Sequence, residues 1–298
     1  MSIIIQGSSG LLQITHAEIK RRIAHQKLFG LEELQKYLFR FCKTVLTADG
    51  ATIEGFSLYD LAPSVLLYGP PNTGKTSLCY LLFDQIKREV TNEINFYTVD
   101  VGRMLDPALG QSSRNLEQIF QDLKNICSDD ESSVFLLLDE LDAFCMSRSR
   151  AQEHDGVRRA MTTLMLELDK LHPSTTNHLL VFGITNVPEL VDTAVVRRFS
   201  LKHFVDAKLS WNEFKFYLEY LNQPLKYNPQ EEELNKLYEI YKARELTTGD
   251  IKGFYKVLMV DVVCNDNVSV KNRLINLFEE GFSTRAHLSQ TYKEYLND

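Results

Sequence analysis

The feature that most constrains this chain is a glycine-bounded loop between an apolar segment and a helical one. Val65–Tyr68 is an apolar run with strand character, and residues 77–82 have the pattern of a helix. Between them, Gly69–Thr76 matches G-x-x-x-x-G-K-[ST] at every fixed position. In such a loop, successive backbone N–H groups surround a polyphosphate at the positive end of the following helix. The sequence therefore predicts a phosphate-binding loop.

The residues of this loop have separate predicted roles. Lys75 is expected to reach the β- and γ-phosphates, and the Thr76 hydroxyl is expected to bind Mg²⁺. Asn72 stands where such loops often carry glycine, and asparagine tolerates a positive φ. A fortuitous glycine-rich turn is the alternative, and the flanking strand and helix weigh against it. The residues expected to bind the nucleotide are Gly69, Pro70, Pro71, Asn72, Thr73, Gly74, Lys75, Thr76 and Ser77.

Apolar strands alternate with helical patterns through the first two thirds of the chain. The expected strands are 65–68, 96–100, 134–138, 179–185 and 201–205. This alternation predicts an α/β fold, a three-layer sandwich around a parallel sheet. A turn at 48–50 is expected to lead into an irregular stretch that ends at Ser64.

The pattern changes after about Asp206. Four helical segments follow with no strand between them, at 211–221, 231–243, 249–263 and 270–295. They predict a small all-α domain attached directly to the sheet domain. The predicted organisation is a flexible or pairing N-terminal arm over 1–27, an α/β domain over 28–206 and a helical domain over 207–298.

Composition narrows the class of protein. The formal net charge of −7 and the isoelectric point near 5.6 argue against a surface built mainly for nucleic acid. The five cysteines are scattered and the seven histidines show no ligand spacing, so reduced core thiols are expected and a structural zinc is not. No apolar run reaches the roughly 20 residues of a membrane span, and the first residues lack a signal-peptide pattern. We expect a cytoplasmic protein.

Acidic and polar residues follow two of the apolar strands. Asp139 and Glu140 end the run Val134–Leu138. Beside a phosphate-binding loop, Asp139 is predicted to complete the Mg²⁺ environment, and Glu140 to act as general base toward the attacking water. Asn186 follows the strand 179–185 and is predicted to hold that water. The alternatives are a solvated strand end for the acidic pair and a simple turn residue for Asn186.

Two adjacent arginines, Arg197 and Arg198, end a short helical segment. They are either part of a solvated surface or an arginine finger that neutralises transition-state charge on the γ-phosphate. The second role requires an oligomer, because a phosphate-binding loop and its finger cannot usually meet within one subunit.

Taken together, the motifs resemble those of AAA+ ATPases. The series G-P-P-N-T-G-K-T, L-L-L-D-E-L-D, G-I-T-N-V-P and D-T-A-V-V-R-R-F is similar to Walker A, Walker B, sensor 1 and the arginine finger, over about residues 28–296. The resemblance implies Mg²⁺-dependent ATP hydrolysis in a ring, usually a homo-hexamer, that threads or remodels a protein. It also implies that Phe29 and Gly30 line the adenine cleft and that Gly249 and Asp250 lie near the nucleotide.

Within that family, the chain is similar to the remodellers of HORMA-domain proteins. The likeness is carried by Thr76–Cys79, by Val157–Arg159 with Leu168-Asp169, and by Val191–Ala194. It implies that Arg198 rather than Arg197 is the finger. Only residues 1–27 precede the core, as in short relatives that resemble the partners of HORMA proteins in nucleotidyltransferase-based antiphage systems. The implied client is a HORMA-domain protein with an associated nucleotidyltransferase.

Two positions depart from the family's pattern. Asp250 stands where a sensor-2 arginine would be expected, and the central-pore loop reads Pro107-Ala108-Leu109-Gly110 without an aromatic residue. Grip on a threaded chain would then depend on Leu109 and its apolar neighbours. The predicted pore-loop residues are Met104, Leu105, Ala108, Leu109 and Gly110.

Two other functions stay open from the sequence. One is a nucleic-acid-processing AAA+ ATPase, such as a clamp-loader-like protein or an initiator, against which the acidic balance weighs. The other is a scaffold that binds nucleotide and cycles little, against which the intact set of Asp139, Glu140 and Asn186 weighs.

Overall fold

The computed structural model describes residues 3–4, 10–90, 93–100, 111–127, 132–142, 154–172, 178–188, 191–265 and 268–288. The chain divides into two compact units, each with its own apolar core. The first unit comprises residues 1–27, 33–69 and 75–204, and the second comprises 28–32, 70–74 and 205–298. The tip of the phosphate-binding loop therefore clusters with the C-terminal helices, whereas the two ends of the loop belong to the first unit.

The described residues of the first unit form a seven-stranded sheet in the order β1-β2-β4-β5-β6-β3-β7. Strands β4, β5, β6, β3 and β7 are parallel to one another. The N-terminal strands β1 and β2 extend the sheet through antiparallel pairings. The predicted α/β fold is confirmed, with a sheet that is mostly rather than wholly parallel. The strands are β1 Ile3–Ile4, β2 Leu11–Ile14, β3 Ser64–Tyr68, β4 Glu93–Val99, β5 Ser132–Leu138, β6 Leu179–Thr185 and β7 Leu201–Phe204.

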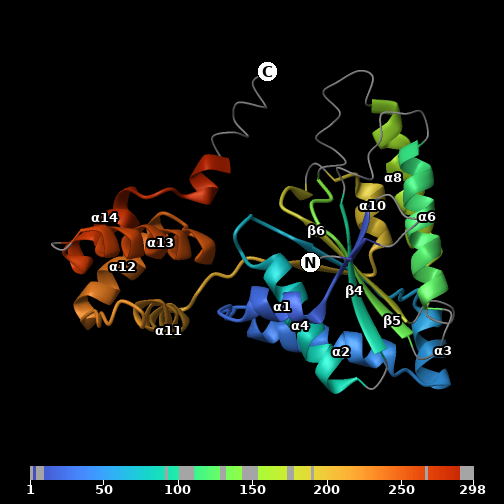
Figure 1. Ribbon diagram of the computed structural model, residues 1–298, viewed down its shortest axis with the longest axis horizontal. Helices are drawn as coiled ribbons and strands as arrows, with labels where there is room; N and C mark the ends of the chain where they lie inside the picture. Colours follow the sequence, from blue (N-terminus) through green and yellow to red (C-terminus); the bar gives the residue numbers. More distant parts are fainter. Residues whose placement is uncertain are drawn as a thin grey trace. The chain divides into compact units, whose positions relative to one another are not determined.

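Helices cover both faces of this sheet. In Figure 1, α1 and α4 lie on one face, and α6 and α8 lie on the opposite face. This arrangement gives the predicted three layers. The helices of the unit are α1 His16–Ile23, α2 Glu32–Leu46, α3 Gly50–Leu58, α4 Lys75–Glu89, α6 Gln111–Ile126, α8 His154–Asp169 and α10 Thr193–Arg198.

Strand β5 shows why its sequence is an unbroken apolar run. Leu136 points into the core that α6 and α8 share with the sheet. Phe135, on the opposite face, stacks on Phe182 of β6 with ring centroids 4.6 Å apart, and Phe83 of α4 meets it edge-on. Because successive side chains alternate between faces, a strand covered on both sides must be apolar at every position.

The N-terminal residues join the sheet. Strand β2 pairs antiparallel with β4, and helix α1 begins directly after it at a Thr15 cap. His16 Nε2 lies 2.7 Å from Asp84 Oδ1 on α4, which ties the segment to the helix that follows the phosphate-binding loop. Of the two expectations for this arm, the structure has the pairing one.

The second unit is helical throughout its described C-terminal part. Its core gathers Phe214, Leu237, Phe254 and Phe278, one from each of the four helices. The all-α prediction for this part is confirmed. The helices are α11 Trp211–Asn222, α12 Glu231–Ala243, α13 Thr248–Cys264 and α14 Val270–Glu280.

Two predictions about local structure were wrong. Residues 50–58 form helix α3 rather than an irregular stretch, because Asp49 caps it by accepting a 2.9 Å hydrogen bond from Thr52 N. That helix buries none of its residues, so it has no apolar periodicity to detect. The last helix was predicted to reach 295, but α14 ends at Glu280. A Cβ on Gly281 would lie 2.3 Å from the Leu277 carbonyl oxygen, so the chain turns on a glycine there.

Among the described residues, no helix is long and apolar enough to cross a membrane. The described cysteines are free thiols, and Cys42 and Cys79 are buried.

Candidate nucleotide-binding and hydrolysis site

The ends of the phosphate-binding loop are fixed in the first unit. Gly69 follows β3 with a φ of 141°, a value that favours glycine. Lys75 is the first residue of α4, and its buried side chain donates a 2.8 Å hydrogen bond to the Gly69 carbonyl. The ammonium group is therefore held back over the loop, where a phosphate chain would lie.

Thr76 and Asp139 connect the start of α4 to the end of β5. Thr76 Oγ1 donates a 3.0 Å hydrogen bond to Asp139 Oδ2. A hydroxyl and a carboxylate in contact are the oxygen donors that Mg²⁺ uses together with water and substrate phosphates. The described residues contain no group of three or more His, Cys, Asp or Glu that could hold a metal ion. The Thr76–Asp139 pair fits a magnesium ion that would take its other ligands from the nucleotide phosphates and water.

Glu140 has an unusual backbone conformation. Its φ is 55°, in the left-handed region, and its N–H donates a 2.9 Å hydrogen bond to Asp139 Oδ1. The next residue returns to the sheet, since Leu141 N donates to Ile184 O at 2.9 Å. A left-handed non-glycine residue costs on the order of 1–3 kcal/mol and tends to occur at functional sites. The Glu140 side chain is exposed, as a base that meets a water molecule must be.

Asn186 follows β6, which lies between β5 and β3 in the sheet. A buried carboxylate, Asp142, holds this end of the strand: it accepts hydrogen bonds from Thr185 Oγ1 at 3.1 Å and from Asn186 N at 3.4 Å. Its contacts join the segment of Glu140 to that of Asn186, and nothing in the spacing of these residues could have revealed the pairing.

The tip of the loop contacts the helical part of the second unit. Gly249 N donates a 3.0 Å hydrogen bond to the Asn72 carbonyl, and Asn72 Nδ2 donates to Thr284 Oγ1 at 3.2 Å. Asn72 has a φ of 62°, as its position in the motif predicted. A Cβ on Gly249 would lie only 2.4 Å from Asn72 Cβ, so the close approach requires glycine at position 249.

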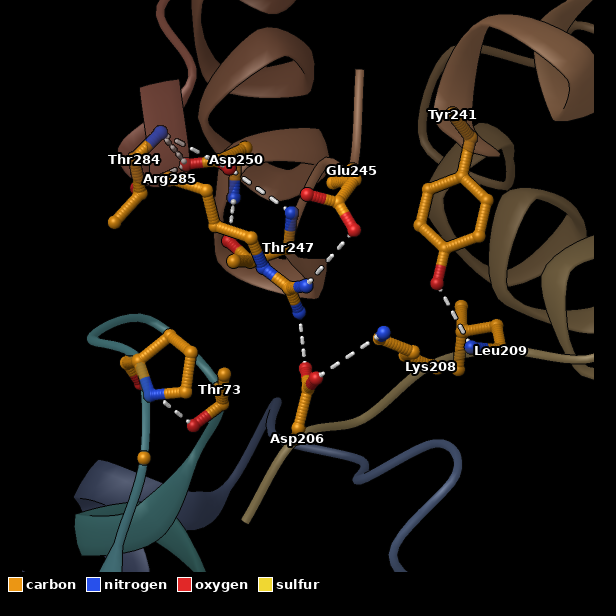
Figure 2. Close-up of polar contacts among 12 residues, drawn as sticks. Thr73, Asp206, Lys208, Leu209, Tyr241, Glu245, Thr247, Asp250, Thr284 and Arg285 are labelled. Carbon is orange, nitrogen blue, oxygen red and sulfur yellow. Dashed lines mark hydrogen bonds and ion pairs between the residues drawn. The ribbon is translucent and has the colours of Figure 1, made fainter. Parts of the chain in front are cut away.

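Asp250 is buried and is occupied by hydrogen bonds within its own unit. It forms a capping box with Thr247 at the start of α13: Thr247 N donates to Asp250 Oδ2 at 2.9 Å, and Asp250 N donates to Thr247 Oγ1 at 3.1 Å. The hydroxyl and the N–H of Thr284 also donate to this carboxylate. Figure 2 shows the group. Asp250 therefore organises the start of α13, which sequence reasoning could have read from the T-x-x-D spacing.

The segment predicted to line the adenine cleft lies in the second unit. Phe29 is 6% exposed and packs against Tyr217, with ring centroids 4.9 Å apart. Gly30 has a φ of 73°, and a Cβ there would lie 3.1 Å from Leu209 Cδ2. Leu28 approaches to 3.0 Å of the point where a Cβ on Gly74 would be. The segment thus reaches the loop tip through Leu28, whereas Phe29 is part of the helical core.

The two arginines at the end of α10 differ in their surroundings. Arg198 Nε donates to Asp169 Oδ2 at 2.9 Å, and its Nη1 donates to the Ala194 carbonyl at 2.8 Å. Arg197 is exposed. The structure therefore gives Arg198 a defined position at the end of α8, while the choice of finger stays a prediction.

The predicted pore-loop residues Met104, Leu105, Ala108, Leu109 and Gly110 lie outside the described residues, and α6 begins at Gln111.

Cys79, inside α4, is fully buried. Burial, with a further contribution from the nearby Asp139 carboxylate, raises the pKa of its thiol well above the ordinary value. Cys79 is therefore a neutral packing residue and not a nucleophile.

These features define a class of protein. A strand, a glycine-bounded loop and a helix with Lys75 and Thr76 at its start, followed by Asp139 at the end of a buried parallel strand, form a P-loop nucleotide-binding domain. Residues 65–207 match the family model described as "ATPase family associated with various cellular activities (AAA)". The chain therefore contains an AAA ATPase domain.

Curated relatives identify a more specific group. The chain is 28% identical over 192 residues to a pachytene checkpoint protein 2 homolog of Danio rerio, over 62% of this chain and 42% of that protein. It is 24% identical over 250 residues to the homolog of Homo sapiens, over 82% of this chain and 54% of that protein. The chain is thus homologous to pachytene checkpoint protein 2 and spans about half the length of these relatives.

The fold is also found in a solved structure. A chain of the E. coli MS115-1 HORMA:CdnC:Trip13 complex superposes with a TM-score of 0.75 at 19% sequence identity. The match covers 93% of this chain and 96% of that one. It shows that the arrangement of strands and helices is shared over nearly the full length of both chains.

Proposed function

We propose that this protein hydrolyses ATP and uses the energy to remodel a protein client of the HORMA-domain type. The observation that carries hydrolysis is the backbone of Glu140. Glu140 has a left-handed backbone conformation and directly follows Asp139 in the chain. The Asp139 side chain contacts Thr76 at the start of α4. A carboxylate presented in this way beside the metal-binding pair is suited to a base that acts on water at the γ-phosphate.

Each residue of the site has a part in this reaction. The ammonium group of Lys75 leaves the Gly69 carbonyl to bind the β- and γ-phosphates. Thr76 and Asp139 would hold Mg²⁺, which when bound would neutralise charge on the phosphates. Glu140 accepts the proton of the attacking water, and the Asn186 side chain orients that water. Asp142 keeps Asn186 in place from the end of β5.

The reaction further needs a cationic side chain beside the γ-phosphate to stabilise the charge of the transition state. We assign it to Arg198 of a neighbouring subunit, because α10 carries two arginines that no assigned step within one chain uses. This assignment requires a closed ring in which each site is completed by the next copy, and we propose a homo-hexamer. The ion pair with Asp169 supports it by fixing the guanidinium on α10.

The proposed client rests on the relatives. The homologs carry the name pachytene checkpoint protein 2, and the solved complex with the same fold is described as containing HORMA, CdnC and Trip13. We propose a HORMA-domain protein as client, with a nucleotidyltransferase as its associated partner. A flexible segment of the client would enter the central pore and meet Leu109 with its neighbours Met104 and Leu105.

Capture of the client tests the proposal. The variant Glu140→Gln, loaded with ATP and Mg²⁺, is mixed with a purified HORMA-domain protein from the same genome and separated by size-exclusion chromatography. Co-elution that needs ATP, together with its loss in Lys75→Ala, is the expected result. The wild-type ring should release the client as ATP is consumed.

The same preparation distinguishes the other functions. ATP turnover that rises on addition of DNA and falls steeply with salt would replace the client with nucleic acid. ATP binding without turnover in the wild-type chain would leave a nucleotide-dependent scaffold. Absence of any complex with the HORMA protein, in a chain that hydrolyses ATP, would contradict the client alone.

A further inference from the structure

Several segments of the second unit are connected to the tip of the phosphate-binding loop. The loop tip 70–74 is bonded to the start of α13 and to the residue before Arg285. The segment 28–32 approaches Gly74 on one side and the linker 205–209 on the other. All of these residues belong to one compact unit. A nucleotide phosphate bound by the loop tip would therefore lie among side chains of this unit.

The acidic residue at the start of α13 cannot serve as a phosphate contact. The Asp250 carboxylate already accepts hydrogen bonds from Thr247 N, from Thr284 N and from the Thr284 hydroxyl. It is also negatively charged, so it would repel a phosphate rather than bind it. What Asp250 does instead is hold Thr284 against Asn72. It thereby fixes the backbone position of the next residue, Arg285.

Arg285 lies at the start of a short helical segment, residues 284–288, and the turn before that segment is fixed from a second direction. The Arg244 guanidinium donates to the Gly281 carbonyl at 2.6 Å, directly after the end of α14. The glycine is required there, because a Cβ on Gly281 would lie 2.4 Å from the Phe254 ring. These contacts fix the conformation of the turn. The turn thereby positions Arg285, which directly follows Thr284, the residue bonded to the loop tip.

Arg285 has donors that no described residue of its own unit uses. Its side chain is 17% exposed, and its Nη2 donates to Asp206. Its Nη1 lies 4.0 Å from a Glu245 oxygen, the outer limit of an ion pair. Within the part of the chain that the structure describes, the buried Nε has no hydrogen-bond partner. A guanidinium has five N–H donors, so this one could bind an anion with several acceptor oxygens.

Asp206 can release Arg285 and still have a positive charge beside its carboxylate. Lys208 Nζ lies 3.9 Å from the second Asp206 oxygen, so a cation stays beside that carboxylate. Figure 2 shows the Arg285 guanidinium between Asp206 and Glu245, with Lys208 on the other side of Asp206. An exchange of Asp206 for a phosphate would leave neither charge unpaired, which limits the cost of the exchange.

We propose that Arg285 binds the phosphate chain of the nucleotide held by the loop, and that Asp206 competes with the phosphates for its guanidinium. This inference rests on the proposed nucleotide site and adds a contact from a position with no family motif. It assigns a phosphate-binding positive charge of the second unit to the helical segment 284–288 rather than to α13. Asp206 then sets how readily that charge becomes available.

The affinity for nucleotide tests this directly. All variants are made in the full chain with Glu140→Gln, so that binding of MgATP and MgADP is measured by calorimetry without turnover. Arg285→Ala should weaken binding of both nucleotides by about 10-fold or more, as expected for loss of a hydrogen bond between charged groups. Asp206→Asn should have the opposite sign and tighten binding, because the competing carboxylate is neutralised. Arg273→Ala, which breaks the ion pair with Asp261 in the same unit, is the matched control and should leave affinity unchanged.

The direction in which each variant changes nucleotide affinity decides whether Arg285 binds phosphate or only supports the fold. If Asp206→Asn and Arg285→Ala weaken nucleotide binding alike, the ion pair only supports the fold and the proposal is overturned. Unchanged affinity in a folded Arg285→Ala chain overturns it as well. If Arg285→Ala does not fold, Asp206→Asn decides alone, and only tighter binding supports the inference. A chain in which Lys75→Ala also leaves affinity unchanged would instead contradict the proposed nucleotide site itself.

Discussion

The Thr76 hydroxyl donates a 3.0 Å hydrogen bond to Asp139 Oδ2, and so joins the first turn of α4 to the end of β5. These two residues lie 63 positions apart in the chain. Their contact turns a loop motif and an acidic strand end into one oxygen-rich site. A bound nucleotide would supply the remaining ligands of a magnesium ion held by this pair.

Removal of the hydroxyl should therefore disturb magnesium use. In Thr76→Ala, we expect ATP turnover to need a higher magnesium concentration and to fall by about 10-fold or more, because one protein ligand is lost. The measurement is steady-state phosphate release across a magnesium titration. Thr162→Ala removes a hydroxyl that bonds only to the carbonyl one turn earlier in α8, and should not change the titration. An unchanged magnesium dependence in Thr76→Ala would remove this residue from the metal site.

Asp142 is expected to act through Asn186. In Asp142→Ala, the carboxylate oxygen that accepts both hydrogen bonds is removed, so the end of β6 loses its anchor. A small displacement of Asn186 should lower kcat by about 10–100-fold and change KM little. Asp122→Ala on α6 is the control. A rise in KM at constant kcat would mean that Asp142 supports nucleotide binding and not the attacking water.

Arg198 is expected to act on the site of the next subunit. Arg198→Ala should bind ATP normally and lose about 10³-fold in turnover, the lower end of the range for arginine fingers. Arg197→Ala is the paired control and should retain most of the activity. The sharper measurement mixes Arg198→Ala with Glu140→Gln subunits, neither of which is active alone. Recovered turnover in the mixture requires a finger supplied by a neighbour. Continued inactivity in mixed rings of proven composition would contradict action between subunits.

Glu167 should contribute to stability in a pH-dependent way. Burial alone would raise the pKa of this carboxyl, but hydrogen bonds from Lys124 at 2.8 Å and Lys170 at 2.5 Å lower it overall. A pKa that is lower in the folded state means that the stabilisation is present above the ordinary glutamate range and is lost as pH falls through the folded value.

Glu167→Gln should therefore cost about 1–3 kcal/mol in the free energy of unfolding at pH 7, as expected for hydrogen bonds to a charged group. The difference between variant and wild type should shrink as the pH falls below the ordinary glutamate range. Urea unfolding at a series of pH values measures it. Glu239→Gln removes an exposed partner of Lys242 and should cost little at any pH. A constant difference across the pH series would mean that the charge of Glu167 is not what stabilises the fold.

The sequence predicted the sheet well because its strands are strongly apolar. Leu179–Thr185 was predicted with its observed limits, and Val134–Leu138 lies within β5. Both strands are buried on two faces, so packing and pattern agree. The exposed helix α3 was missed for the opposite reason, because it buries nothing and depends on the Asp49 cap. The end of α14 depends on a steric contact of Gly281 with distant residues, which no periodicity records.

The site shows the same division. Local motifs predicted Lys75, Thr76, Asp139 and Glu140, because their roles follow from their position at the ends of strands and helices. The contacts of Asp142 and Arg285 involve partners far along the chain: Asp142 contacts Thr185, and Arg285 contacts Asp206. Such pairings arise from tertiary packing and leave no spacing in the sequence. The departure at Asp250 and its T-x-x-D spacing were visible in the sequence, but the contact of its carboxylate with Thr284 was not.

The central claim is that this chain hydrolyses ATP with Glu140 as the base, and steady-state phosphate release tests it most directly. Wild-type protein and Glu140→Gln are compared at saturating MgATP, with ATP binding measured in parallel. We expect turnover in the wild type, a loss of about 100-fold or more in the variant, as for removal of a general base, and undiminished ATP binding in both. Equal turnover in the two proteins, or ATP binding with no turnover in the wild type, would contradict it.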